Sequence, residues 1–595
     1  MWSVPDRGSM IPCRWPARKR AGDNPRMDPR PHTPCNIAAS LPQLARERPD
    51  QVAMHCPDRA GRYRIAISYA QLDARSDAIA AGLARQGIVR GSRTVVMVRP
   101  TPEFFLLMYA LFKLGAVPVL VDPGIDKRAL KQCLGEAQPQ AFIGIPLAMA
   151  AKALLGWAKS ARIRITTGSS AWLADATLQA VEAAGQDAGP QLADTTPDEV
   201  AAVLFTSGST GVPKGVVYRH RHFAGQIELL GRAFGMQPGG VDFPTFPPFA
   251  LFAPALGLTA VIPDMDPTRP AQANPKKLHA AIRQFGATQL FGSPALMRVL
   301  ADAGTAMPTV KRVTSAGAPV PPDTVAAILK LLPDDAQFWT PYGATECLPV
   351  SVIEGRELLT LRGKTEQGLG TCVGRPVPPN EVRLIAISDA PIARWEHVRE
   401  VRAGQVGEIT VAGPTATDSY FNRDAQTALA KISETLPDGS TRIVHRMGDL
   451  GWFDGEGRLW FCGRKSQRVV KDADTTLCTE QIEPVFNTHP QVRRTALVGV
   501  PRDKGADAAN AGWAVLCVEL DPGVRASDWP RIEAELRHLA DGNVQTGPVD
   551  GFLHYPKPFP VDIRHNAKIG REKLALWAQR EWSRLQRSQA RREAR

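Results

Sequence analysis

Paired cysteine spacings are missing from this chain. Its 595 residues include nine cysteines, none in a C-x-x-C pair, and no signal peptide is recognisable before them. This pattern argues against a disulfide framework and favours reduced thiols in a cytoplasmic protein. The chain is too long for one hydrophobic core, so we expect roughly two to four domains.

An uninterrupted apolar span is also missing. The stretch 243–262 is apolar enough to suggest a membrane span, but it contains four prolines: Pro244, Pro247, Pro248 and Pro254. They would repeatedly break a helix exposed to lipid. We therefore predict a core segment and pocket wall there, and no transmembrane segment.

The middle of the chain has little excess charge, although the net charge is +13. Residues 1–33 carry seven Lys and Arg against three Asp, and residues 571–595 carry eight against three Glu. The two ends thus hold nine of the thirteen charges, and we expect no nucleic-acid partner. Residues 1–33 lack apolar periodicity and are predicted to be a disordered basic extension.

The predicted C-terminal helix has a basic face formed by Arg580, Arg584, Arg587 and Arg591. We interpret this face as solvated. Peripheral contact with anionic lipid or an acidic partner is the alternative.

Helix and strand patterns alternate in the first part of the chain. A helix pattern at 68–87, a strand at 94–98, a helix at 101–115 and a strand at 117–121 follow one another. This alternation predicts an α/β fold with mainly parallel sheets flanked by helices. No internal repeat is evident.

Turn-rich strands at 407–411 and 459–461 predict an additional small, barrel-like sheet. We place a boundary at Gly463-Arg464, after a passage dense in Gly and Asp. The predicted organisation is a large domain over 34–463 and a smaller α+β domain over 464–595.

A loop rich in glycine and hydroxyl groups follows the apolar strand 201–205. It reads Thr206-Ser207-Gly208-Ser209-Thr210-Gly211-Val212-Pro213-Lys214-Gly215 and does not fit the Gly-x-x-x-x-Gly-Lys-Ser/Thr pattern of a Walker A loop. Its N–H groups and hydroxyls can surround phosphate oxygens, and Lys214 adds charge. A flexible surface turn is the alternative, but turns seldom combine so many phosphate-binding groups.

This loop resembles the phosphate-binding signature of the adenylate-forming enzymes: acyl-CoA synthetases, peptide-synthetase adenylation domains and luciferases. Four further motifs occur in the order that this family requires, so that the resemblance covers residues 36–575. They are Ser315-Ala316-Gly317-Ala318-Pro319; Tyr342-Gly343-Ala344-Thr345-Glu346; His445-Arg446-Met447-Gly448-Asp449-Leu450-Gly451; and Gly463-Arg464 with Asn566-Ala567-Lys568-Ile569-Gly570-Arg571.

The resemblance implies that these motifs bind ATP. The phosphates would be held by Thr206, Ser207, Gly208, Ser209, Thr210 and Lys214. The adenine would be flanked by Gly317, Ala318 and Pro319, and contacted by Tyr342 and Gly343. Asp449 would accept hydrogen bonds from both ribose hydroxyls, with Arg464 assisting; a plain turn aspartate is the alternative.

The same resemblance implies a set of catalytic residues. Thr345 would contact the α-phosphate, Glu346 would hold Mg²⁺, and Lys568 would be a catalytic lysine carried by a mobile C-terminal domain. Mg²⁺ prefers one or two carboxylates together with substrate phosphates. Read alone, residues 342–346 also fit a strand-end loop with a helix cap, and Lys568 fits a solvated charge.

The chain departs from most of the family at two positions. Asp474 stands where relatives have a glycine that leaves room for the pantetheine arm of a thiol acceptor. Ser466 replaces the usual hinge aspartate. An acid at 474 would narrow the tunnel for the pantetheine arm and place negative charge beside a phosphate-bearing donor. This departure disfavours a thiol acceptor, and the use of coenzyme A stays open.

The predicted acyl pocket is strongly apolar and lacks the gating histidine of many relatives. It would be lined by Phe246, Phe249 and Phe252. Each methylene of a buried alkyl chain contributes about 0.8 kcal/mol, so a fatty acyl substrate is expected. Plain core packing is the alternative for these side chains.

Residues 216–223 and 243–263 resemble one branch of the family, whose members close 2-alkyl-3-hydroxy fatty acids into β-lactones during long-chain olefin synthesis. The resemblance implies ATP and Mg²⁺ as cofactors, a hydroxy fatty acid as substrate, and AMP and pyrophosphate as products. His220 and His222 are candidate bases for the substrate hydroxyl, although each could equally be a core or solvated histidine.

Two other functions stay open. The chain could be a fatty acyl-CoA synthetase or fatty acyl-AMP ligase, or a non-catalytic nucleotide-binding scaffold. For the favoured function, the resemblance implies assembly with an α/β-hydrolase-type β-lactone decarboxylase and a reductase of the same pathway.

Overall fold

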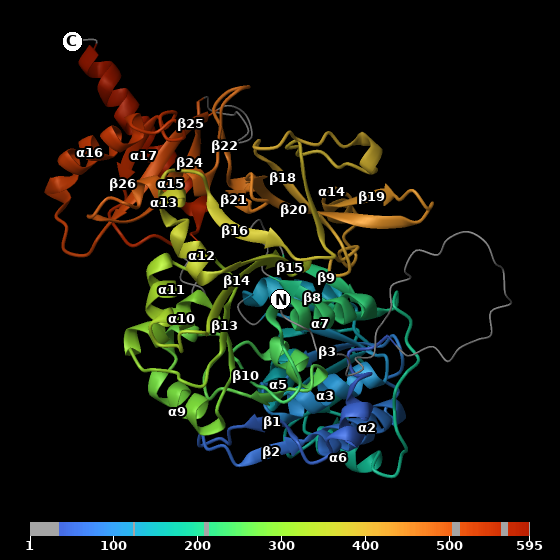
Figure 1. Cartoon of the computed structure of the whole chain (residues 1–595). Helices are drawn as coiled ribbons and strands as arrows, with labels where there is room; N and C mark the ends of the chain where they lie inside the picture. The colour runs from blue at the N-terminus through green and yellow to red at the C-terminus, as the bar shows by residue number, and fades with distance from the viewer. Residues whose placement is uncertain (1–34, 123–124, 207–212, 503–511, 561–568, 594–595) are drawn as a thin grey trace. The chain divides into compact units, whose positions relative to one another are not determined.

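The computed structural model describes residues 35–122, 125–206, 213–502, 512–560 and 569–593 (Figure 1). The chain divides into two compact units. The first comprises Met1–Pro263 with Ser419–Arg423, and the second comprises Asp264–Asp418 with Asp424–Arg595. The extension predicted at 1–33 lies outside the described residues.

The main sheet of the first unit has seven strands in the order β7-β6-β5-β3-β4-β8-β9. Their bounds are β3 Arg93–Met97, β4 Val117–Val121, β5 Ala141–Gly144, β6 Ile163–Thr166, β7 Ala176–Thr177, β8 Val200–Thr206 and β9 Lys214–Arg219. All neighbouring pairs are parallel except β8 and β9. The expected parallel sheet is therefore confirmed.

Helices α2 (Tyr69–Arg85), α3 (Pro102–Lys113) and α6 (Leu178–Ala184) belong to this unit, with α4 (Lys127–Glu136) and α5 (Pro146–Leu155). Helix α2 packs against both α3 and α6 (Figure 1). The Ser68 side chain caps α2 by accepting a hydrogen bond from the Gln71 N–H. The Gln71 side-chain oxygen in turn accepts from the Ser68 N–H, which completes a capping box.

Helix α3 is buried at every residue except Glu103, because its apolar side chains surround the whole helix. Its last residue, Lys113, is buried and forms ion pairs of 2.6 Å with Asp73 and with Asp77.

A second group of strands in this unit is ordered β10-β11-β1-β2, with bounds β10 Val241–Pro244, β11 Thr259–Val261, β1 Val52–Cys56 and β2 Ile65–Ser68. The proline-rich stretch between β10 and β11 forms the short helices η1 (Pro247–Leu251) and α8 (Phe252–Ala255). Helices α1 (Leu41–Glu47) and α7 (His220–Phe234) complete the unit. In the part of the chain that the structure describes, no helix has the length and apolar character needed to cross a membrane.

The segment Ser419–Arg423 belongs to the first unit although the residues on either side of it do not. It runs along β9: the Val217 N–H donates to the Ser419 carbonyl at 3.1 Å, and the Phe421 N–H donates to the Gly215 carbonyl at 2.7 Å. Arg423 forms a bidentate pair with Glu136 at 2.7 and 2.9 Å. The segment thus covers the outer edge of the seven-stranded sheet.

The second unit contains a run of strands in the order β12-β13-β14-β15-β16-β21-β20-β18-β17, with β19 also paired to β20. Their bounds are β12 Gln289–Gly292, β13 Arg312–Ser315, β14 Gln337–Ala344, β15 Cys347–Glu354, β16 Thr371–Pro376, β17 Glu381–Ile385, β18 Gly407–Ala412, β19 Lys431–Thr435, β20 Thr441–Phe453 and β21 Leu459–Arg464. The first three are parallel and the others antiparallel. The antiparallel strands correspond to the small sheet expected from the turn-rich sequence.

Helices α9 (Pro275–Phe285), α10 (Pro294–Ala303) and α11 (Pro322–Leu329) pack side by side next to β12, β13 and β14 (Figure 1). The remaining helices of this part are α12 (Gly355–Thr360), α13 (Arg362–Glu366) and α14 (Asp424–Ala430).

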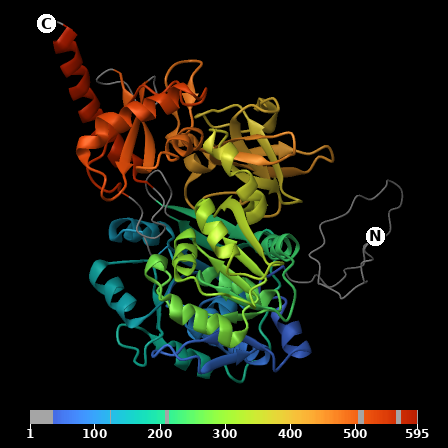
Figure 2. The ribbon, with the colours of Figure 1, turned by 60° about the vertical axis from the view of Figure 1, so that its left-hand side comes forward.

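The C-terminal part of the second unit is built on the sheet β24-β25-β26. Its elements are β24 Val492–Pro501, β25 Gly512–Leu520, β26 Gly551–His554, α15 Thr479–Phe486, α16 Trp529–Asp541 and α17 Arg571–Glu593, with the hairpin β22 Val469–Val470 and β23 Thr476–Leu477. Helix α17 contains all four arginines of the basic face predicted for a C-terminal helix. Leu574 and Ala578, near the start of α17, are buried. The end of the helix extends beyond the sheet in both views (Figure 1 and Figure 2).

Candidate functional site

The phosphate loop predicted from the sequence connects β8 to β9. Thr206 is the last residue of β8 and pairs in register with Lys214, the first residue of β9. A side chain at Gly215 would place its Cβ 2.8 Å from the Phe205 ring, so only glycine fits there. Ser207, Gly208, Ser209 and Thr210 lie outside the described residues, and their phosphate role stays a prediction.

Lys214 is fixed by the segment that covers β9. Its Nζ lies 5.0 Å from the ring centroid of Tyr420, a cation–π arrangement. This contact holds the ammonium group next to the end of the predicted loop.

His220 and His222 lie in the first turn of α7, and both are buried. Within the described residues neither ring nitrogen of His220 has a hydrogen-bond partner, and burial lowers the pKa of this imidazole to about 4. His222 Nδ1 accepts a hydrogen bond from the Arg219 N–H at 2.9 Å. His220 therefore has the surroundings of a core histidine. A role as the base, for His220 or for His222, remains a prediction.

The three phenylalanines predicted to line an acyl pocket form a row on η1 and α8. Ring centroids are 5.2 Å apart for Phe246 and Phe249, and 6.3 Å apart for Phe249 and Phe252. Phe246 is 43% exposed, whereas Phe252 is buried. The row therefore runs from the core to the surface, and its role as the wall of an acyl pocket stays a prediction.

The motif Tyr342 to Glu346 is a strand with a turn. Tyr342, Gly343 and Ala344 end β14, and Ala344 pairs with Cys347 of β15, so Thr345 and Glu346 form a two-residue hairpin connection. The alternative of a helix cap is therefore wrong. Because a Cβ at Gly343 would lie 2.6 Å from the Cys347 carbonyl oxygen, the tight turn requires glycine.

The motif that begins at Ser315 starts on the last residue of β13 and continues into the loop that follows. Gly317 has φ +100, a conformation that L side chains rarely adopt. The buried hydroxyl of Ser315 has no hydrogen-bond partner among the described residues. Ala318 and Pro319 then lead toward α11. The glycine leaves the backbone open to close approach by a planar base, which is the role predicted for Gly317.

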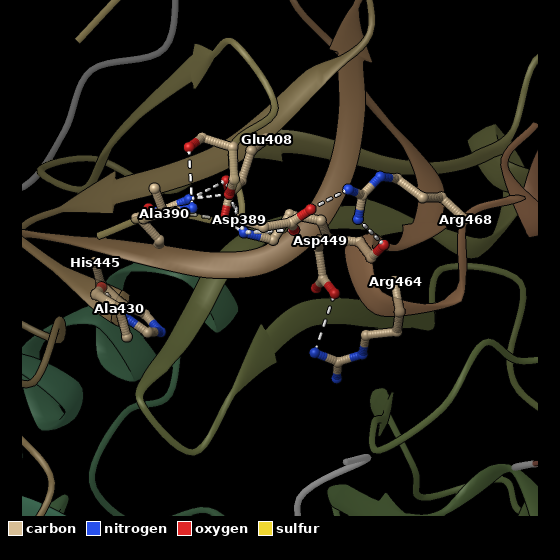
Figure 3. A network of polar contacts seen from close by, with 11 residues as sticks. Asp389, Ala390, Glu408, Ala430, His445, Asp449, Arg464 and Arg468 are labelled. Atoms are coloured by element: carbon tan, nitrogen blue, oxygen red, sulfur yellow. Dashed lines mark hydrogen bonds and ion pairs between the residues drawn. The ribbon is translucent and has the colours of Figure 1, made fainter. Parts of the chain in front are cut away.

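Asp449 is the centre of the polar site in the second unit. It lies on β20 and pairs in register with Arg464 of β21, so that two motifs far apart in sequence become neighbours. The Tyr342 hydroxyl donates to Asp449 Oδ2 at 2.6 Å. Arg464 Nη1 lies 3.0 Å from Asp449 Oδ1, a contact drawn in Figure 3. The structure thus brings together three of the residues predicted to bind the nucleoside.

The surroundings of Asp449 are those expected for the predicted ribose contact. The side chain is buried, and this burial raises the pKa of its carboxyl. Oδ1 forms the ion pair with Arg464 but receives no hydrogen bond of acceptable geometry from the described residues. Buried oxygens are normally hydrogen-bonded, so Oδ1 keeps acceptor capacity for a ligand hydroxyl.

A buried ion pair next to this site was not predicted. Arg446 and Glu408 have side chains 1% exposed and lie 2.7 Å apart. Lys465 approaches the same carboxylate at 3.1 Å, and Arg468 pairs with Asp389 (Figure 3). Removing one member of a buried pair typically costs about 3–5 kcal/mol, so this network fixes the strands that carry Asp449 and Arg464.

The two departures from the family pattern lie in the second unit. Ser466 is in the short helix η4 (Lys465–Gln467). Asp474 is exposed at the tip of the β22–β23 hairpin, where the N–H groups of Asp474 and Thr475 donate to Asp472 Oδ1 at 3.0 and 2.8 Å. The carboxylate of Asp474 is thus available to a molecule approaching this loop.

The possible metal ligands are few. The described residues contain no cluster of three or more His, Cys, Asp or Glu side chains that could hold a metal ion. Glu346 would therefore act as a single protein carboxylate, and Mg²⁺ binds readily in that way when phosphates and water supply the other ligands. Lys568 lies outside the described residues.

The comparisons with known proteins identify the class. The family model of AMP-binding enzymes matches residues 41–421. The chain therefore belongs to the AMP-binding enzymes, adenylate-forming ligases that use ATP, and the resemblance seen in the sequence is confirmed.

Two curated relatives are similar to this chain over almost its whole length. The chain is 67% identical over 562 residues to the olefin beta-lactone synthetase of Xanthomonas campestris pv. campestris, covering 94% of this chain and 99% of that protein. It is 68% identical over 554 residues to the olefin beta-lactone synthetase of Stenotrophomonas maltophilia, with 92% and 99% covered.

Solved structures confirm the predicted fold class. The amide bond synthetase McbA from Marinactinospora thermotolerans superposes with a TM-score of 0.70 at 22% identity, covering 91% of this chain and 99% of that chain. ATP-bound MatB from Rhodopseudomonas palustris gives a TM-score of 0.71 at 21% identity, with 92% and 99% covered.

Proposed function

We propose that this protein is a β-lactone synthetase, which activates a long-chain 2-alkyl-3-hydroxy fatty acid with ATP and closes it to a β-lactone. The observation that carries the proposal is the 67–68% identity, over nearly the whole chain, to two proteins named olefin beta-lactone synthetase. The ribose-binding geometry of Asp449, Tyr342 and Arg464 supports the use of a nucleotide.

The first step forms an acyl-adenylate. A carboxylate oxygen of the acid attacks the α-phosphorus, the bond to the β-phosphate oxygen breaks, and pyrophosphate leaves. Asp449 and Arg464 hold the ribose, Thr345 and Lys568 contact the reacting phosphate, and Glu346 would hold Mg²⁺. Bound Mg²⁺ would neutralise phosphate charge, and positioning and electrostatics provide most of the catalysis.

The second step closes the ring. The 3-hydroxyl oxygen attacks the activated carbonyl carbon, the bond to the adenylate oxygen breaks, and AMP leaves. The hydroxyl proton passes to a base or to a phosphate oxygen of the departing AMP. An intramolecular nucleophile can reach an effective molarity of roughly 10⁵–10⁸ M, which helps to offset ring strain.

A product assay tests the proposal. The purified protein is incubated with ATP, Mg²⁺ and a racemic 2-alkyl-3-hydroxy fatty acid, with and without coenzyme A, and the lipids are weighed by mass spectrometry. We expect a species one water lighter than the acid, with AMP and pyrophosphate, whether or not coenzyme A is present. A thioester formed only with coenzyme A would indicate an acyl-CoA synthetase, and the absence of AMP would indicate a binding scaffold.

We expect Asp474→Gly to permit some thioester formation. The glycine removes both the side chain and the negative charge from the exposed tip of the β22–β23 hairpin, where a pantetheine arm would pass. The measurement is acyl-CoA formed from the same acid with coenzyme A, against Asp472→Asn as a variant that changes charge in the same turn. Efficient thioester formation by the wild type would contradict the view that Asp474 obstructs the pantetheine arm.

Further aspects of the function are also proposals. The organisation that fits this mechanism is a large domain over 34–463 and a mobile domain over 464–595 that keeps the adenylate from water. We place the protein in the cytoplasm, acting beside a β-lactone decarboxylase and a reductase. The basic end of α17 is the surface we assign to any peripheral lipid contact.

A further inference from the structure

Lys431 is a buried lysine that none of the roles above uses. It begins β19, directly after α14, and is 6% exposed. Its Nζ donates hydrogen bonds to the main-chain carbonyl of Thr417 and, at 3.2 Å, to Thr417 Oγ1. Burying an ammonium group costs free energy unless it is paired and hydrogen-bonded. The groups that hydrogen-bond to Lys431 therefore show what its charge is used for.

Thr417 connects this lysine to the Thr345-Glu346 turn, which carries the predicted Mg²⁺ ligand. Its N–H donates to the Glu346 main-chain carbonyl at 2.9 Å, and its hydroxyl donates to the same oxygen at 3.0 Å. The hydroxyl of Thr417 accepts from Lys431 and donates to Glu346. The ammonium therefore fixes the rotamer in which Thr417 holds the backbone of Glu346.

The charged groups around Lys431 are consistent with an ammonium group that is held in one position. Burial lowers the pKa of its ammonium to about 8, while the carboxylates of Glu346 and Asp418 favour the charged form. His445 lies directly across from Lys431 on β20, and its Nδ1 is 3.1 Å from the Ala430 carbonyl oxygen (Figure 3). The position of Lys431 is thus set on both sides, by Thr417 and by the β19–β20 pairing.

We propose that Lys431 is a positioning residue for Glu346, holding the Thr345-Glu346 turn through Thr417 and thereby setting the affinity of the site for Mg²⁺ during adenylate formation. The inference rests on the proposed function, because it assumes that Glu346 is the Mg²⁺ ligand. Partners that orient a metal ligand typically change metal affinity or activity by about 10–100-fold when they are removed.

The test has two readouts: the Mg²⁺ dependence of ATP–pyrophosphate exchange with the hydroxy fatty acid at saturating ATP, and the Mg²⁺ dependence of ATP binding by calorimetric titration without the acid. We expect Lys431→Met to raise the free Mg²⁺ concentration for half-maximal exchange by about tenfold or more. Lys431→Arg keeps the charge and the donors and should restore most of the affinity. Thr417→Val removes only the hydroxyl relay and should shift it in the same direction by a smaller factor.

A matched control is available in the first unit. Lys113 is also a buried lysine hydrogen-bonded to oxygens, those of Asp73 and Asp77, but these belong to helix packing. Lys113→Met should lower the melting temperature and leave the Mg²⁺ dependence as in the wild type. If Lys431→Met does the same, Lys431 is merely structural and the inference is overturned.

Failure of the proposed function gives a different result. A wild-type protein with no Mg²⁺-dependent exchange on any hydroxy fatty acid would overturn that function, and the role of Lys431 with it. If Glu346→Gln raises the Mg²⁺ concentration needed for exchange, and Lys431→Met and Thr417→Val leave it as in the wild type, the inference alone is overturned. If Lys431→Met does not fold, Thr417→Val decides between the same outcomes: a Mg²⁺ dependence like that of the wild type would overturn the inference.

Discussion

Asp449→Asn is expected to lower kcat/KM for ATP by about 100-fold, which corresponds to about 2.7 kcal/mol. The buried carboxylate accepts from the Tyr342 hydroxyl through Oδ2 and keeps Oδ1 as an acceptor for a ribose hydroxyl. Asparagine keeps the shape but loses the charge, one acceptor and the ion pair with Arg464. Steady-state ATP–pyrophosphate exchange at varied ATP measures the change.

The pH dependence gives a second readout for the same variant. Burial raises the pKa of Asp449, so as pH falls its carboxylate form is lost at a higher pH than for an ordinary aspartate. Since kcat/KM reports groups of the free enzyme, the wild type should show an acid limb that Asp449→Asn lacks.

Asp454→Asn is the matched control for Asp449. Asp454 follows β20, but its oxygens accept from protein groups, Arg458 at 2.7 Å and Trp460 at 2.9 Å. This variant should lower stability and leave the KM for ATP unchanged. A normal KM for ATP in Asp449→Asn would show that the ribose lies elsewhere.

Lys568→Ala is expected to slow adenylate formation by about 10²–10³-fold while changing the affinity for ATP by less than about threefold. A charge that stabilises the transition state contributes mainly to kcat, not to ground-state binding. Pre-steady-state formation of acyl-adenylate measures the first effect, and calorimetric titration with ATP without the acid measures the second.

Lys573→Ala serves as the control for this variant. Lys573 is an exposed lysine of the same basic segment, in the first turn of α17. It should behave as the wild type in both measurements. Normal turnover by Lys568→Ala would refute the catalytic role assigned to the C-terminal segment.

The features predictable from the sequence are those with local causes. The helix pattern that starts at residue 68, the apolar strand before Thr206 and the βαβ alternation each depend on residues close together in the chain, and the structure confirms them. Asp449 and Arg464 were predicted through motif resemblance. Their contact depends on the register of β20 against β21, which the spacing of the motifs does not reveal.

The residues that the sequence did not mark depend on long-range pairing. Glu408 looks like an ordinary strand residue, and only the pairing of β18 with β20 brings it to Arg446. Lys431 and Thr417 are equally inconspicuous in the chain, since their link to Glu346 arises only when the hairpin β14–β15 approaches residue 417. The hairpin form of residues 342–346 was also missed, because turn and cap residues have similar compositions.

The short stretch Ser419–Arg423 has a consequence for synthesis of the protein. A chain emerging from the ribosome presents Met1–Pro263 well before residues 419–423 arrive to cover β9. Until then the β9 backbone is an open edge, to which other nascent chains could add a strand. Completion of the first unit therefore waits until almost half of the second has been translated, and fragments ending before residue 419 should be prone to aggregation.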